Sequence, residues 1–241
     1  MLAWLNQGGV LTLFLEGALA GAAVAVGASA CAFALGLVLG VALLWARLSR
    51  YRLLRGMVMA WVSAIRGTPA LIHMLLAYYV VPPLLGLSIS PLAAGIGALA
   101  CNTSAYLVEI LRGALSSVPD AQRAAAQALG MREPQVWRHV LLPQVFYRAI
   151  PPLTSEFTIL LKASSLMSII AVPELATVAR NASLQSDLPL QVFAMTAAVY
   201  FVILFCISAA ARVCERRVSW MLPMPFDFAV AAQAVPCCSA A

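Results

Sequence analysis

The sequence predicts an all-α, polytopic membrane protein with about five transmembrane helices. Hydrophobic residues make up 63% of the 241 residues and charged residues only 10%, whereas soluble domains carry roughly 25% charged residues. Apolar runs long enough to span a bilayer recur along the chain, and basic residues are clustered between them. Soluble packing cannot hide this much apolar surface, so most of the chain is expected to lie in lipid.

The predicted helices are separated by charged or proline-containing segments. The first contains two small-xxx-small pairs, Gly17/Gly21 and Gly36/Gly40. Such pairs let neighbouring helices approach closely, but glycine is also common in membrane helices generally, and the pattern alone leaves both readings open. The five helices are expected at residues 17–45, 57–81, 91–111, 148–172 and 188–211.

The distribution of basic residues predicts the orientation. Loops rich in Lys and Arg face the cytoplasm, so the N-terminus is expected outside and the C-terminus in the cytoplasm. Only Arg180 falls in a loop on the other side, and Arg66 and Lys162 fall within helices. The remaining basic residues share one side: Arg47, Arg50, Arg52, Arg55, Arg112, Arg123, Arg132, Arg138, Arg148, Arg212, Arg216 and Arg217.

Three regions are expected along the chain. Residues 1–16 are expected to form a segment outside the membrane, residues 17–217 a transmembrane domain, and residues 218–241 a tail of unknown role. The first apolar run has no preceding Lys or Arg and is far longer than a signal-peptide core. It is therefore expected to be a retained membrane helix.

The loop at residues 118–143 reads as a polar helical module on the cytoplasmic side. Ser117 and Asp120 have capping-box spacing, Pro119 suits a first turn, and Gly130 stands where a helix C-cap is expected. A second short helix is expected from Pro134 to Leu142, stopping before Pro143. One face of the first helix carries an apolar stripe: Ala121, Ala124, Ala125, Ala128 and Leu129.

Two readings of this stripe follow from the pattern. It either lies against the chain's own membrane helices or fits the groove of a cytoplasmic partner, where small side chains allow close backbone approach.

The module resembles the EAA loop of ABC-importer permeases. That loop reads Glu-Ala-Ala, a glycine, and then a hydrophobic-x-Leu-Pro ending, and Ala124 stands here in place of the glutamate. The resemblance implies that the loop docks in a cleft of the ATP-hydrolysing subunit and transmits its movement. The coupling-loop candidates are Asp120, Ala121, Ala124, Ala125, Ala126, Ala128, Leu129, Gly130, Val140, Leu142 and Pro143.

Other motifs resemble the polar-amino-acid branch of this family. They include "IRGTPALIHMLLAYY" at residues 65–79, where His73 replaces the usual glutamine, and the segments before and after the loop, where Ala163 replaces a usual polar residue. The resemblance implies a MetI-like, type I importer permease that moves a polar amino acid by alternating access. It also implies three partners: cytoplasmic ATP-hydrolysing subunits, an external binding protein, and a second permease, identical or paralogous.

Ionisable and polar groups at membrane depth are candidates for the translocation path or for bracing helices. Glu109 and Arg112 are spaced to pair on one helical face. Glu156 and Lys162 point to different faces and are not expected to pair. The candidates are Arg66, Thr68, His73, Asn102, Ser104, Tyr106, Glu109, Glu156, Lys162, Ser164 and Ser165, with Thr103 in the same polar patch.

Five of these candidates have specific expectations. Arg66 precedes a predicted kink at residues 67–69 and is expected to brace its helix against a carboxylate. His73 is expected to be a hydrogen-bonded core residue rather than a proton relay. Lys162, Ser164 and Ser165 either attract a substrate carboxylate, or they satisfy helix backbone and a neighbouring acid.

The sequence carries no motif for hydrolysing ATP. No glycine precedes a lysine, so there is no Walker-type loop, and no Gly-x-Ser-x-Gly elbow is present. We expect a transport subunit without its own ATPase and without a cofactor. The alternative is a self-sufficient ion-coupled transporter or channel, but an odd helix count without an internal repeat counts against it.

A membrane enzyme and a metal site are both disfavoured. Only His73 and His139 are available, and no cysteine pair has zinc-ligand spacing. Cys237 and Cys238 are adjacent in the tail, where only a strained bridge is expected. The cysteines within apolar runs are expected to be small core residues: Cys31, Cys101 and Cys206.

Overall fold

The computed structural model describes residues 8–186 and 188–219, and this part of the chain contains helices and no strands. Four of its helical stretches are long and apolar enough to cross a membrane, and a fifth span results if one bent pair is counted. The all-α class and the number of about five spans are therefore confirmed. The elements are α1 (Gly8–Leu48), α2 (Arg52–Gly67), α3 (Ala70–Leu75), η2 (Leu76–Val80), α4 (Val81–Leu85), α5 (Pro91–Ser116), α6 (Asp120–Ala128), α7 (Glu133–Val136), η3 (Trp137–Leu141), α8 (Leu142–Ala163), η4 (Ser164–Ile170), α9 (Leu175–Ser186) and α10 (Pro189–Ser219).

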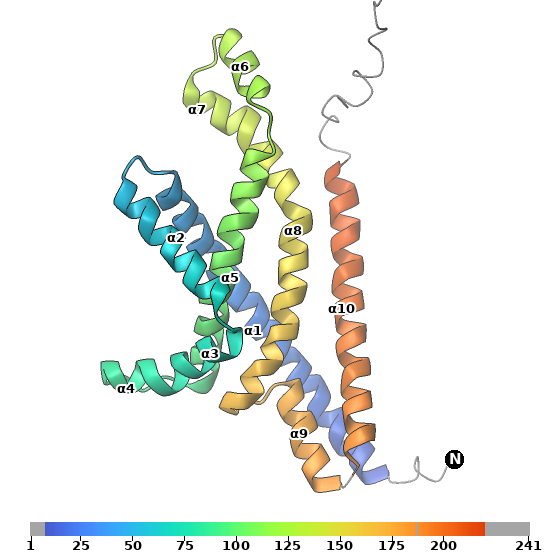
Figure 1. The fold of residues 1–241 in the computed structure, drawn as a ribbon. Coiled ribbons are helices and arrows are strands. Elements are labelled where there is room, and N and C mark those ends of the chain that lie inside the picture. Colours follow the sequence, from blue (N-terminus) through green and yellow to red (C-terminus); the bar gives the residue numbers. More distant parts are fainter. Residues whose placement is uncertain (1–7, 187, 220–241) are drawn as a thin grey trace, which may run out of the picture.

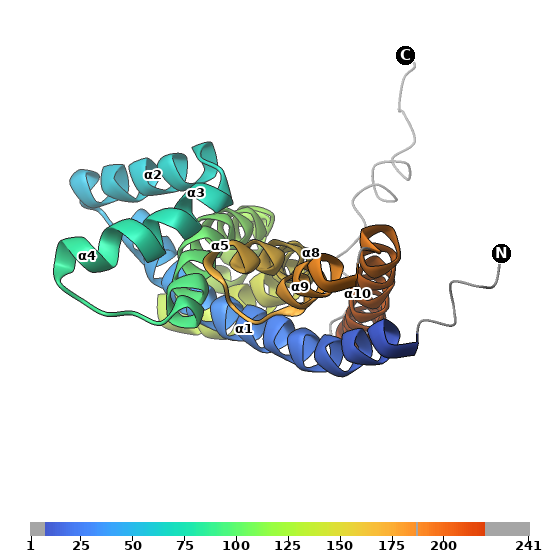
Figure 2. The same cartoon turned by 90° about the horizontal axis from the view of Figure 1, so that it is seen from below.

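The long helices α1, α5 and α8 form the centre of the molecule. α1 packs along α5 and reaches α9, while α5 also packs on α8 and α2. Figure 1 shows α6 and α7 projecting beyond α5 and α8, at the end opposite to α9. Seen from below, α2, α3 and α4 lie on one flank and α10 on the other (Figure 2). The predicted module is thus an outgrowth at one end of the helical bundle.

The glycines of α1 mark close helix contacts. A Cβ on Gly40 would lie 2.9 Å from the Leu107 Cβ of α5, and one on Gly21 would lie 2.9 Å from the backbone of Leu175 on α9. Gly36 and Gly17 make similarly tight approaches to the same two helices. The close-approach reading of both small-xxx-small pairs is therefore confirmed.

The second span is broken more sharply than the kinked helix expected at residues 57–81. α2 and the stretch Ala70–Leu85 meet at an angle of 105°. The break falls at the predicted kink, because Pro69 has no N–H to donate and drives Thr68 out of helical geometry, to φ −120° and ψ 146°. Beyond the break the helix passes Pro82 and ends at Gly86, whose φ of 64° is left-handed.

The expected helix end before Pro143 is wrong. Residues Glu133–Ile170 form one continuous helical stretch, so the fourth span does not begin at Arg148. The π-helical turn η3 lies immediately before Pro143, which occupies the first turn of α8. This wider turn accommodates a residue that has no N–H. As a result, the module is joined to the membrane by an unbroken helix.

Two further expectations need correction. α9 was not predicted, because the segment after residue 172 shows no strong apolar period.

Cys31 and Cys206 are exposed and Cys101 is half-buried, so they are not core residues. An apolar run does not reveal which of its faces meets lipid. Residues 1–7 and the tail with Cys237 and Cys238 lie outside the described residues.

Candidate translocation cavity and coupling module

The first helix of the module, α6, is defined by its two ends. Pro119 is its N-cap, and the predicted capping box is wrong because the Ser117 hydroxyl donates to the Ala114 carbonyl instead, at 2.7 Å. At the other end Gly130 has a φ of 78°. The Gly130 N–H donates to the Gln127 carbonyl at 2.9 Å and the Met131 N–H to the Ala126 carbonyl at 3.2 Å. These two bonds form a Schellman motif, as the glycine predicted.

The module has its own small core. Ala126 is the buried residue of α6 and packs with Val118, Val136 and Leu141. Glu133 ties α7 to α6 by accepting hydrogen bonds from Arg123 and Gln127, at 2.9 and 2.6 Å. These contacts hold α6 as a unit without using its alanine stripe.

The alanine stripe faces outward. In the part of the chain that the structure describes, the stripe does not pack against the chain's own membrane helices, so that interpretation of the pattern is wrong. Leu129, at the end of the stripe, is 83% exposed. Asp120 and Leu142 are also exposed, whereas Val140 and Pro143 are half-buried. The exposed stripe residues are Ala121, Ala124, Ala125, Ala128 and Leu129.

A cavity of about 590 Å³ opens where α2 breaks and faces α5 and α8. We call it the bend cavity. Five of the polar path candidates meet there although they come from distant parts of the chain: Arg66, Thr68, Asn102, Tyr106 and Glu156.

Two groups in this cavity lack a partner. Glu156 is only 7% exposed, yet among the described residues no hydrogen bond or ion pair reaches its carboxylate. The Thr103 hydroxyl is buried and also unpartnered within the described chain. Buried polar groups are normally hydrogen-bonded. The Thr103 hydroxyl has no accessible surface, so the Glu156 carboxylate is the group available to a ligand in the cavity.

A hydrogen-bond chain braces the wall of the bend cavity across the break. The Asn102 amide donates to His73 Nδ1 at 3.2 Å, and the Thr68 hydroxyl donates to the Ala64 carbonyl at 2.8 Å. His73 Nε2 therefore donates to the Thr68 oxygen, which makes the ring neutral with its proton on Nε2. His73 is therefore hydrogen-bonded as expected, but it is only half-buried and is not the expected core residue.

His73 can be tested by two substitutions. We expect His73→Leu to lower the stability of the folded chain by about 1–2 kcal/mol, because it leaves Asn102 and Thr68 without their shared partner. His73→Gln keeps one donor and one acceptor and should lose less. Thermal unfolding of the purified chain in detergent measures both. Equal losses for Leu and Gln would show that the hydrogen bonds contribute nothing.

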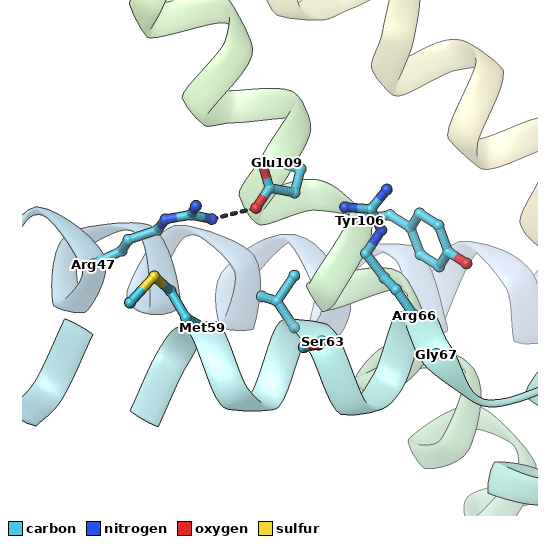
Figure 3. A pocket seen from close by; sticks show the side chains of 8 residues that line it. Arg47, Met59, Ser63, Arg66, Gly67, Tyr106 and Glu109 are labelled. Carbon is cyan, nitrogen blue, oxygen red and sulfur yellow. Dashed lines mark hydrogen bonds and ion pairs between the residues drawn. The ribbon is translucent and has the colours of Figure 1, made fainter. Parts of the chain in front are cut away.

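A second cavity, of about 520 Å³, lies beside the first along α2 and α5. We call it the Glu109 cavity. Glu109 accepts hydrogen bonds from Arg47 of α1 and from Arg112, the latter at 3.0 Å. The predicted Glu109–Arg112 pair is present, and Arg47 is an addition that sequence reasoning had placed in a loop. Figure 3 shows the Arg47–Glu109 pair at one end of the cavity and Arg66 at the other.

Arg66 does not brace a carboxylate, contrary to expectation. Its guanidinium carbon lies 5.4 Å from the centre of the Tyr106 ring, which is cation–π distance. Within the described residues this is the one charged or aromatic contact of Arg66. In Figure 3 the Arg66 side chain reaches from α2 to the Tyr106 ring on α5.

The remaining candidates are not gathered in either cavity. Lys162 is exposed and makes no ion pair with Glu156 or any other described residue. Ser164 and Ser165 donate to the carbonyls of Leu161 and Lys162, both at 2.8 Å. Ser104 likewise donates to a backbone carbonyl of its own helix. The serine hydroxyls thus satisfy helix backbone, which was one of the two readings left open.

Sequence reasoning missed Glu174. It is fully buried, accepts a hydrogen bond from the Thr177 amide at 3.0 Å, and accepts another from the Tyr200 hydroxyl at 2.9 Å. Burial raises the pKa of its carboxyl, while these hydrogen bonds act in the opposite direction. Glu174 caps α9 and links it to α10. Its only signal in the sequence was an acidic residue after Pro173.

Comparison with known proteins agrees with this architecture. Residues 32–220 match the family described as binding-protein-dependent transport system inner membrane component. The L-cystine transport system permease protein TcyB of Bacillus subtilis is 36% identical over 186 residues, covering 77% of this chain and 79% of that protein. The glutamine transport system permease protein GlnP of Escherichia coli is 31% identical over 183 residues, covering 76% and 84%.

Solved structures share the fold. One described as an amino acid ABC transporter with histidines has a TM-score of 0.81 and 28% identity, covering 90% of this chain and 99% of that chain. The inward-facing methionine transporter MetNI has a TM-score of 0.67 at 21% identity and supports the fold alone. The chain belongs to the binding-protein-dependent transport system inner membrane components, the permease subunits of ABC importers.

Proposed function

We propose that this chain carries an amino acid across the bacterial inner membrane as the permease subunit of an ATP-driven importer. The observation that carries the proposal is the bend cavity, which holds the Arg66 cation and the unpartnered Glu156 carboxylate. An amino acid presents a carboxylate and an ammonium group, which complement these two charges. Relatives of this chain are named for cystine, glutamine and arginine transport.

The exposed alanine stripe is proposed as the contact with the ATP-hydrolysing subunit. Ala126 and the Glu133 bonds fix α6 from behind, so the stripe is free to enter a partner's groove. The continuous helix from α7 into α8 leads directly to Glu156. Movement at the module can therefore reach the cavity through one continuous helical stretch. The missing EAA glutamate, replaced by Ala124, removes one ion pair that this contact would otherwise have.

The proposed orientation places the module in the cytoplasm and the N-terminus outside, as the basic loops indicate. A substrate-binding protein would then deliver the amino acid from the side of α9. The permease domain is proposed to comprise residues 17–217. Because the bend cavity is open on one side of a single chain, a second permease, identical or paralogous, is proposed to complete it.

The carboxylate of Glu156 can be tested with Glu156→Gln. We expect KM for the transported amino acid to rise about ten- to a hundredfold, because a charge-assisted hydrogen bond to the ammonium group is lost. Thermal stability should be unchanged or higher, since a buried unpaired charge is removed. Uptake by proteoliposomes that hold the assembled transporter measures the first, and thermal unfolding the second. A stability loss with unchanged KM would assign Glu156 a structural role and contradict the proposal.

A further inference from the structure

The bend cavity and the Glu109 cavity are separated by a narrow boundary. They share three lining residues, Arg66, Gly67 and Tyr106. Gly67 contributes no side chain. The boundary between the two spaces is therefore made by the Arg66 guanidinium and the Tyr106 ring, which lie 5.4 Å apart.

The charges on the two sides of this boundary differ. On one side the Glu156 carboxylate has no partner among the described residues. On the other, the Glu109 carboxylate is already bound by Arg47 and Arg112. Glu109 is thus occupied and does not draw Arg66 away from the ring. Of the arginines that line the two cavities, Arg66 is the one whose guanidinium contacts only an aromatic ring within the described chain.

We infer that the Arg66–Tyr106 contact is a partition between the two cavities, and that the carboxylate of the transported solute opens it. The inference rests on the proposed function and names Arg66 and Tyr106 as its positioning residues. A cation–π contact at a partly exposed site is weak, whereas Arg binds a carboxylate through two charge-assisted hydrogen bonds. A solute held by Glu156 through its ammonium therefore takes the guanidinium from the ring. The ring is then free to turn, and the path toward the Glu109 cavity opens.

This arrangement selects for the solute's carboxylate. A solute without one has nothing to exchange for the cation–π contact, so the partition stays closed. Arg47 lines the Glu109 cavity beyond the partition, where it is paired with Glu109.

The test uses substitutions of Tyr106 in the assembled transporter. Leak of preloaded radiolabelled L-glutamine, L-arginine and L-cystine from proteoliposomes without ATP should rise about tenfold in Tyr106→Leu, which replaces the ring by a smaller apolar side chain. Tyr106→Phe restores the ring and should reverse most of that leak. Tyr106→Trp, with the strongest cation–π face, should slow ATP-driven uptake below the wild-type rate.

A second measurement reports the partition without transport. Ser63→Cys introduces a thiol into the Glu109 cavity, and Ala163→Cys introduces one into the bend cavity. In inverted membrane vesicles, a membrane-impermeant thiol reagent should label Ser63→Cys about tenfold faster than Ala163→Cys. Peptide mass spectrometry resolves the labelled sites. Adding Tyr106→Leu should remove most of the difference in labelling rate. Equal labelling of both positions with the ring intact, or a leak unchanged in Tyr106→Leu, would overturn the partition. Absence of ATP-driven uptake in the wild-type transporter would instead overturn the proposed function and leave the labelling result to decide on the partition.

Discussion

Ala125→Arg is expected to reduce ATP-driven uptake by at least about tenfold, while the chain still inserts and folds. The reason is that truncation or blockage at the centre of an interface commonly costs about 2 kcal/mol or more of binding free energy. Ala125 lies on the exposed stripe of α6 and makes no core contact. A long charged side chain there holds the partner away from the backbone. The measurement is uptake of radiolabelled amino acid by vesicles, with the amount of folded chain determined by size-exclusion chromatography.

Two neighbouring positions on the same helix provide matched controls. Gln122→Arg adds the same charge at an exposed position about a quarter turn from the middle of the stripe, and uptake should stay close to wild type. Ala126→Arg places the charge in the module core, so the chain itself should lose folded material. If Gln122→Arg were as damaging as Ala125→Arg, charge on α6 and not contact through the stripe would explain the loss.

Gly21→Ala is expected to destabilise the chain by about 1–3 kcal/mol, the usual range for overpacking a close contact. The added Cβ would lie 2.9 Å from both the nitrogen and the Cα of Leu175, and backbone atoms cannot rotate away as a side chain can. α1 and α9 must then separate. Since Glu174 links α9 to α10, the change should also loosen that contact. Thermal unfolding of the purified chain measures the effect.

The matched control lies on the same helix. Gly27 has no atom within 4 Å of the position that a Cβ would take. Gly27→Ala should therefore be neutral or slightly stabilising, because alanine is the better helix former. A Gly21→Ala chain as stable as Gly27→Ala would mean that α1 and α9 do not pack as described.

Much of the fold could be predicted from the sequence because lipid imposes strong constraints. The apolar runs gave the spans, and Gly130 and Pro69 marked a helix end and a break that the structure contains. The continuation of the helix through Pro143 could not be predicted, since a π-helical turn that accommodates proline leaves no periodic signal. α9 was missed for a different reason: it is held by the buried Glu174, a tertiary contact rather than a local pattern.

The candidate site was predictable only as a set of residue types. Polar groups at membrane depth singled out Arg66, Asn102, Tyr106 and Glu156, and these share one cavity. Their partners were not predictable, because pairing depends on how α2, α5 and α8 face each other. Arg66 meets a ring instead of the expected carboxylate. The serines near Lys162 looked equally suitable in sequence but donate to their own helix.

The most direct test of the central claim is affinity purification of the tagged chain from its own membranes in mild detergent, with every co-purifying chain identified by mass spectrometry. We predict that an ATP-hydrolysing subunit co-purifies with the wild type and with Gln122→Arg, and is lost from Ala125→Arg. The account would be contradicted by a chain that purifies alone and, in liposomes, moves solute down an ion gradient without ATP.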